Sequence, residues 1–167
     1  MRRESANVRV FPPFPALVWT GKMAGMDEAE RQALSHVGRT IAYKYRLLGL
    51  LAARGTAAVY EAEHVFTKRR VALKRLHRAL ATEDVERVLR EMRAPSTIGH
   101  PGIVQVLDGG AEPDGSLYWV RELLQGVSMQ EALDRGTLDV AAILQIGIEL
   151  LEALEAAHAH GFLHGDI

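Results

Sequence analysis

The chain has 167 residues, of which 48% are hydrophobic and 25% are charged. This composition is typical of a globular protein and supplies enough apolar side chains for one domain with a core. The formal net charge of -1 gives no general signal for binding polyanions, so we expect no nucleic-acid partner. Cysteine is absent, which excludes a disulfide framework, a thiol nucleophile and a zinc site built on cysteine.

Two further features bear on the location of the protein. No run of residues approaches the ~20 apolar residues that a membrane span needs. An apolar stretch near the start is interrupted by Pro12, Pro13 and Pro15, so no signal peptide is expected. Together with the absence of cysteine, these features favour a cytoplasmic protein with no membrane span in this chain.

Charge is unevenly distributed along the chain. Residues 68–93 hold nine Lys or Arg against four Asp or Glu, whereas residues 108–167 hold two against eleven. This asymmetry has three interpretations: electrostatic pairing inside one fold, a local site for anions, or two solvated faces. The pattern does not decide among them.

The first part of the chain shows little regular pattern. Residues 1–25 are expected to be a disordered leader, or sequence upstream of the true start, since Met23 and Met26 are alternative start residues. Residues 26–36 are expected to form a short helix. No internal repeat is visible.

From Tyr45 onward the sequence predicts a series of strands. Apolar and β-branched runs bounded by turn residues predict strands at 45–52, 57–65 and 69–76. Two later runs predict strands at 103–110 and 116–123, joined by a turn rich in Pro, Asp and Gly.

Three segments have the period of a helix. Val85, Val88, Leu89 and Met92 recur on one face of a predicted helix over 82–94, which Pro95 ends. Ser128 and Glu131 form a capping box that opens a short helix at 129–134. The longest helix is predicted at 139–160, with an apolar stripe of Ile143, Ile146, Leu150, Leu151, Leu154 and Ala157. The order of elements predicts an α+β fold, in which an antiparallel sheet carries one helix and a helical region follows.

Lys74 and Glu91 are the first candidates for chemistry. On a strand, Ala72 and Lys74 share one face, so this lysine could reach a phosphate beneath a flat apolar ligand. Glu91 lies on the next predicted helix and could hold the ammonium of Lys74 in place. A solvated lysine and a surface ion pair of little consequence are the ordinary alternatives.

Five motifs in one order add to this pair. They are VALK at 71–74, LREM at 89–92, HPGIVQVLD at 100–108, LYWVREL at 117–123 and FLHGD at 162–166. The set resembles the protein kinase family, specifically the bacterial serine/threonine protein kinases, over about residues 38–167. The resemblance implies a kinase-like small lobe, with a five-stranded antiparallel sheet plus a helix, followed by a truncated helical large lobe. It divides the chain into a leader at 1–37, the small lobe and hinge at 38–124, and the start of the large lobe at 125–167.

The resemblance also implies a role for individual residues. Lys74 matches the lysine that contacts the α- and β-phosphates of ATP, and Glu91 matches its partner on the helix. Asp166, with His164 beside it, matches the base that accepts the proton of the substrate hydroxyl. The remaining matches concern the nucleotide: Val59 and Ala72 cover adenine, Glu122 and Leu124 pair with its edge through their backbone, and Gly55 remains near the phosphates. The expected ligands are ATP with Mg²⁺ and a protein substrate.

The sequence departs from the family at several of these positions. The three glycine positions of the phosphate loop fall at Ala52, Arg54 and Ala57, so side chains there are expected to hold the loop away from phosphates. Gly165 replaces the arginine of the catalytic loop. Arg121 stands where an apolar residue usually lies behind adenine, and a buried guanidinium needs a partner, for which Glu91 is a candidate.

After Asp166 the family has an asparagine and an aspartate that bind Mg²⁺, and neither is in this chain. We therefore expect the chain alone not to transfer phosphate at a useful rate, because the reaction depends on positioning and on charge neutralisation by metal. No metal site replaces them, since His158 and His160 are two residues apart on a helix and diverge. The apolar stripe of 139–160 is expected to bind a large-lobe segment in trans or a second copy of the chain.

Three interpretations of function remain. The first is the N-terminal part of a serine/threonine protein kinase, which Lys74, Glu91 and Asp166 favour. The second is a pseudokinase-like module that binds partners or nucleotide without catalysis, which the lost glycines, Arg121 and Gly165 favour. The third is a gene remnant without a function.

Overall fold

A computed structural model describes residues 26–76, 88, 92 and 97–163 of the chain. The expected leader at 1–25, most of the helix expected at 82–94, and residues 164–167 lie outside the described residues. The strands are β1 Thr40–Ile41, β2 Tyr45–Arg54, β3 Ala57–His64, β4 Arg70–Leu76, β5 Val106–Ala111 and β6 Leu117–Glu122, and the helices are α1 Glu28–Leu34, α3 Met129–Asp134 and α4 Val140–Ala159.

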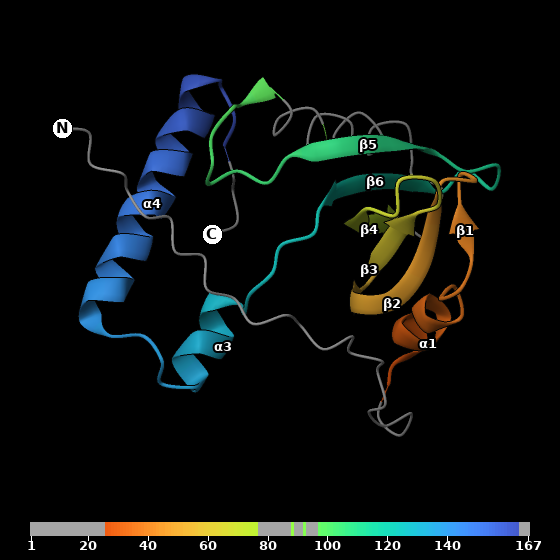
Figure 1. The fold of residues 1–167 in the computed structure, drawn as a ribbon, viewed down its shortest axis with the longest axis horizontal. Helices are drawn as coiled ribbons and strands as arrows, with labels where there is room; N and C mark the ends of the chain where they lie inside the picture. The colour runs from red at the N-terminus through yellow and green to blue at the C-terminus, as the bar shows by residue number, and fades with distance from the viewer. Residues whose placement is uncertain (1–25, 77–87, 89–91, 93–96, 164–167) are drawn as a thin grey trace.

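The strands form one antiparallel sheet in the order β1-β2-β3-β4-β6-β5. In Figure 1 this sheet curls on itself, with α1 against β1 and β2, while α3 and α4 lie on the other side of the molecule. The α+β prediction is thus confirmed. The expected number of strands was five, and the described residues form six, because the two-residue strand β1 adds an edge to β2. A strand this short leaves no periodic signal in the sequence.

Each described helix begins directly after a capping residue whose side chain accepts a backbone N–H of the first turn. Asp27 opens α1 with a complete capping box, in which its side chain and that of Glu30 each accept the other residue's backbone N–H. Ser128 Oγ accepts the backbone N–H of Glu131 at 3.1 Å and opens α3. Asp139 Oδ1 accepts the N–H of Ala142 at 2.7 Å and opens α4. The helices predicted at 26–36, 129–134 and 139–160 are therefore all present.

The inner face of the curled sheet holds the main core. Its fully buried members include Tyr60, Ile41, Leu47, Leu73 and Val120, and Ala33 of α1 belongs to the same cluster. The Tyr60 hydroxyl donates to the carbonyl oxygen of Ala33 at 2.9 Å, which fastens α1 to β3. Burial raises the pKa of Tyr60 to about 12. Helix α1, which precedes position 38, therefore packs on the same sheet as the residues that follow.

The opposite face of the sheet carries a second, smaller core. Leu76 and Trp119 are buried there together with Val88, and Met92, Val106 and Leu117 pack around them. A Cβ on Gly109 would lie 2.2 Å from Met92 Cε, so the glycine leaves the space that the methionine fills. Val88 and Met92, two of the residues predicted to share one face of a helix, therefore both pack against residues of β5 and β6.

An acidic side chain links distant parts of the curled sheet. Asp108 on β5 accepts a hydrogen bond from the Tyr45 hydroxyl at 2.9 Å and from Lys44 Nζ at 3.1 Å. Strand β2 and strand β5 are not neighbours in the sheet, so this contact closes the curl across it. Burial alone would raise the pKa of Asp108, but the hydrogen bonds from Tyr45 and Lys44 outweigh it and hold that pKa below its usual value.

Replacing Asp108→Asn tests this closure through its pH dependence. A carboxyl whose pKa is depressed by folding adds stability above its unfolded pKa, near 4, and that stability is lost as the pH falls through the folded value. The variant is expected to be less stable than the parent at pH 7, by about 1 kcal/mol, and equal to it near pH 2. Urea unfolding followed by circular dichroism at several pH values measures this. A constant difference from pH 7 to pH 2 would contradict the assignment.

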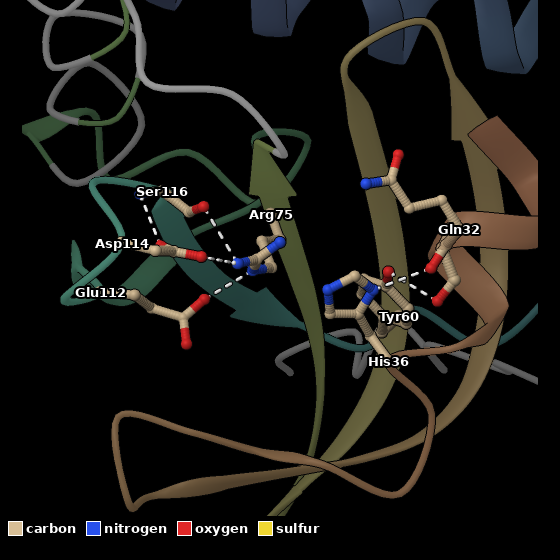
Figure 2. A network of polar contacts seen from close by, with 8 residues as sticks. Gln32, His36, Tyr60, Arg75, Glu112, Asp114 and Ser116 are labelled. Atoms are coloured by element: carbon tan, nitrogen blue, oxygen red, sulfur yellow. Dashed lines mark hydrogen bonds and ion pairs between the residues drawn. The ribbon is translucent and has the colours of Figure 1, made fainter.

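A buried cation joins β4 to the turn between β5 and β6. Arg75 Nε lies 2.5 Å from Glu112 Oε2, and its Nη2 lies 2.8 Å from Asp114 Oδ2 and 3.0 Å from Ser116 Oγ. Figure 2 shows the guanidinium turned toward these three residues, next to the Tyr60 and His36 contacts with α1. These contacts pair an arginine of the basic segment 68–93 with two carboxylates of the acidic segment 108–167 inside the fold. Lys68 and Arg70 pair instead with nearby Glu63 and Glu61.

Candidate functional site

Val59, Ala72 and Lys74 lie on the face of the sheet opposite the main core. Val59 is paired with Lys74 across β3 and β4, and Ala72 is two residues along β4 from Lys74. Side chains two apart on a strand share a face, and directly paired residues also do. The structure therefore brings these three predicted residues together, with small or apolar side chains beside one amine.

The Lys74 ammonium is positioned by an aromatic ring. Its Nζ lies 4.9 Å from the centre of the Trp119 ring, within the range of a cation–π contact. Trp119 is the cross-strand partner of Lys74 on β6 and is buried. The predicted partner Glu91 lies outside the described residues, so its contact with Lys74 remains a prediction. Sequence reasoning missed Trp119, because only the β4–β6 register reveals that it is paired with Lys74.

The hairpin between β2 and β3 stands where the family has its phosphate loop. Arg54 is paired with Ala57, so the connection is a two-residue turn of Gly55 and Thr56. Gly55 has φ +55, a conformation that favours glycine at the first position of such a turn. The strands stay paired to the tip, although the β2 register shifts between Leu47 and Gly49 and between Leu50 and Ala52. Ala52 and Arg54 are exposed there.

The segment after β6 presents free backbone groups. Strand β6 ends at Glu122, whose side chain accepts the backbone N–H of Gln105 at 3.3 Å. Leu124 follows on the way to α3 and is 60% exposed. No hydrogen bond joins the Leu124 backbone to any residue that the structure describes, so its N–H and C=O are available to a ligand. Free backbone groups at this point agree with the prediction that the backbone here hydrogen-bonds the edge of adenine.

Arg121 lies on the same face of the sheet as Ala72 and Lys74, one residue before the end of β6. It is paired with Ala72 of β4 on one side and with Val106 of β5 on the other. Burial lowers the pKa of its guanidinium. Within the described ranges, no hydrogen bond or ion pair links Arg121 to another residue. Glu91, the partner suggested by the sequence, is outside those ranges.

The HPGIV motif forms a turn that links the sheet to α4. His100 Nδ1 accepts the backbone N–H of Gly102 at 3.1 Å. A Cβ on Gly102 would lie 3.0 Å from Ala153 Cβ, and Ala153 is the buried residue of α4. The glycine therefore allows the long helix to approach the turn closely. This contact gives a physical reason for a motif that the sequence offered only as a family marker.

The predicted catalytic residues Asp166 and His164 lie outside the described residues, as does Glu91. Among the residues that are described, no group of three or more His, Asp or Glu side chains could hold a metal ion. The candidate residues that the structure describes are therefore those predicted to contact the nucleotide. None of the helices in the described ranges is long and apolar enough to cross a membrane.

Residues 46–167 match the protein kinase domain family. The match covers most of the chain, and it agrees with the curled antiparallel sheet and the ordered motifs. The chain belongs to the protein kinase family. The relatives that it matches include serine/threonine-protein kinases of bacteria.

Three relatives illustrate the extent of the similarity. The chain is 35% identical over 135 residues to the serine/threonine-protein kinase Pkn3 of Myxococcus xanthus, covering 79% of this chain and 25% of that protein. It is 37% identical over 133 residues to the DNA damage-responsive kinase RqkA of Deinococcus radiodurans, covering 78% and 20%. A solved PknI kinase domain of Mycobacterium tuberculosis superposes with a TM-score of 0.65 at 31% identity, covering 78% and 53%. The chain thus spans a fifth to a quarter of these two curated relatives and about half of the solved kinase domain.

Proposed function

We propose that this chain forms the nucleotide-binding part of a serine/threonine protein kinase, which binds ATP with Mg²⁺ and transfers the γ-phosphate to hydroxyl groups of proteins. The observation that carries the proposal is the shared sheet face of Val59, Ala72 and Lys74, with the ammonium held over Trp119. A flat base can lie on the small and apolar side chains while the amine contacts phosphate.

The position of each residue along the strands assigns it to one part of the nucleotide. Val59 and Ala72 contact the base, and the backbone of Glu122 and Leu124 hydrogen-bonds its edge. Lys74 contacts the α- and β-phosphates, and Gly55 lies at the phosphate end of the face. Glu91 orients Lys74, and Asp166 accepts the proton of the protein hydroxyl.

A second candidate is a module that binds nucleotide or a protein partner without phosphate transfer. The β2–β3 hairpin favours it, because Ala52 and Arg54 place side chains where a close backbone approach to phosphate needs glycine. Incubation of the protein with γ-labelled ATP, MgCl₂ and a general protein substrate tests for phosphate transfer. Incorporation of label supports the kinase and excludes the module, whereas nucleotide binding without incorporation is compatible with both, because the chain alone is expected not to transfer phosphate at a useful rate.

Nucleotide binding is tested by Lys74→Ala. Removing the ammonium eliminates a charged hydrogen bond to phosphate, which contributes about 1.5–3 kcal/mol. The Kd for mant-ATP, measured by energy transfer from tryptophan, is expected to rise by roughly 10- to 150-fold. The matched control is Lys68→Ala, which removes a lysine that is paired with Glu63 in the turn before β4. The control is expected to leave the Kd unchanged.

Two outcomes would remove the nucleotide-binding proposal. The first is the absence of any saturable signal from mant-ATP with the parent chain. The second is an equal Kd for the parent and Lys74→Ala. Circular dichroism of each variant checks that the sheet is still folded, so that loss of binding is not confused with loss of structure.

A further inference from the structure

The half-buried Arg121 has no role in the contacts proposed between this site and ATP. Its two cross-strand neighbours, Ala72 and Val106, have no side-chain atoms that accept a hydrogen bond. No hydrogen bond or ion pair connects its guanidinium to the other described residues. A guanidinium that is partly removed from water, with no acceptor among the described residues, is costly, and burial already lowers its pKa. The position therefore favours a ligand that supplies acceptor atoms.

The position of Arg121 along the sheet indicates which part of a nucleotide it meets. The hairpin at Gly55 lies toward the Lys74 and Leu76 end of β4, since Ala57 is paired with Leu76 and Val59 with Lys74. Arg121 is paired with Ala72, two residues farther from that hairpin, which is about 7 Å along the strand. It also directly precedes Glu122, the last residue of β6, after which the segment with Leu124 begins. Arg121 therefore lies at the base end of the proposed site and away from the phosphates.

Purine bases differ at the edge that a guanidinium would meet. Guanine presents two acceptors, O6 and N7, which match the two parallel donors of an arginine. Adenine presents the N7 acceptor beside the N6 amino group, which is itself a donor. A guanidinium next to adenine would thus gain one hydrogen bond and place two donors against each other. A fixed arginine discriminates between these bases by roughly 1–3 kcal/mol.

We infer that Arg121 is a specificity-determining residue that makes this site prefer a 6-oxopurine nucleotide, such as GTP, over ATP. The inference rests on the proposed nucleotide site and deepens it, because it names the base that the site selects. The guanidinium donates to O6 and N7 of the base, while Ala72 and Val106 pack against its flanks. Lys74 keeps the same role toward the phosphates for either nucleotide.

The test compares three nucleotides on the 167-residue chain. Displacement of mant-nucleotide by unlabelled GTP, ITP and ATP, each with MgCl₂, gives three Kd values. ITP keeps O6 and N7 but lacks the 2-amino group, so it isolates the proposed contact. GTP and ITP are expected to bind about 5- to 150-fold more tightly than ATP. Arg121→Met is expected to reduce that preference to less than twofold, with a smaller effect on ATP.

A matched control replaces another arginine of the same sheet. Arg46→Met removes an exposed arginine of β2 and the same formal charge, and it is expected to leave the GTP to ATP ratio unchanged. Arg121→Lys keeps the charge but loses the paired donors, so it is expected to show an intermediate ratio. This variant also serves if Arg121→Met does not fold.

Each outcome bears either on the base preference set by Arg121 or on the nucleotide site itself. Equal or tighter binding of ATP than of GTP and ITP by the parent chain overturns the preference but leaves the nucleotide site intact. A preference that persists in Arg121→Met shows that another residue selects the base. Tight GTP with weak ITP assigns the selection to the 2-amino group and also overturns the role of Arg121. Failure of all three nucleotides to bind removes the site itself.

Discussion

Replacing Arg75→Met is expected to lower the free energy of unfolding by about 3–5 kcal/mol, which is a large fraction of the roughly 5–15 kcal/mol that stabilises an ordinary domain. The Arg75 side chain is 4% exposed and that of Glu112 is 15% exposed. Methionine fills a similar volume but leaves the Glu112 carboxylate with little water and no cation. The β5–β6 turn also loses its contact with β4. Removing one partner of a buried ion pair costs far more than the pair contributes by itself.

The experiment compares this variant with two others in urea, followed by circular dichroism. Asp114→Asn is the matched control, because Asp114 is 60% exposed and asparagine can still accept the backbone N–H of Ser116. Its cost is expected to stay below about 1 kcal/mol. The double variant Arg75→Met with Glu112→Gln is expected to recover part of the loss, since it removes the stranded charge. A loss below about 1 kcal/mol for Arg75→Met would show that the pair is not buried in solution.

The chain is expected to self-associate at tens of micromolar through α4. Six large apolar residues of this helix are exposed in the structure: Val140, Ile143, Leu144, Ile148, Leu150 and Leu151. Val140 is 72% exposed and Leu151 is 66% exposed, while only Ala153 is buried. A contiguous apolar surface of this kind is removed from water when two copies pair. Sedimentation velocity is expected to show dimers or larger species, with the double variant Leu144→Glu, Leu151→Glu shifted strongly toward monomer.

The control places the same charges on exposed aromatic residues of the sheet. Tyr43 is 92% exposed and Phe66 is 82% exposed, and both lie in turns between strands. The double variant Tyr43→Glu, Phe66→Glu is expected to sediment like the parent. A parent chain that is monomeric at this concentration would contradict the prediction. An equal shift in the control would show that added charge, and not the α4 surface, sets the association.

Local patterns predicted the elements well where they are long and bounded by strong signals. The helix expected at 139–160 is found at Val140–Ala159, because Asp139 caps it and its apolar residues repeat over five turns. The strand expected at 103–110 begins later, at Val106, because the HPG segment forms a turn whose His100 accepts a backbone N–H. Strand β1 was not predicted, since its two residues are held by their pairing with β2.

The residues of the candidate site were likewise predictable only where they depend on local pattern. The period of a strand placed Ala72 and Lys74 on one face, and the order of five motifs identified the family, which the comparison with known kinases confirms. Trp119 under Lys74 and the two apolar neighbours of Arg121 were not predictable in this way. Both depend on how β6 is aligned with β4 and β5, which shifts by one residue if a bulge is added or lost.

The family, the α+β class and the face of β4 that carries the candidate amine follow from the amino-acid sequence alone. These properties depend on residues close together in the chain or on the order of short motifs. The burial of Arg75 among acidic partners and the contact of Asp108 with Tyr45 across 63 positions, in contrast, follow from no local pattern and are seen only in the folded chain. The reason is that burial and long-range pairing depend on the curl and register of the whole sheet, which many weak contacts fix together.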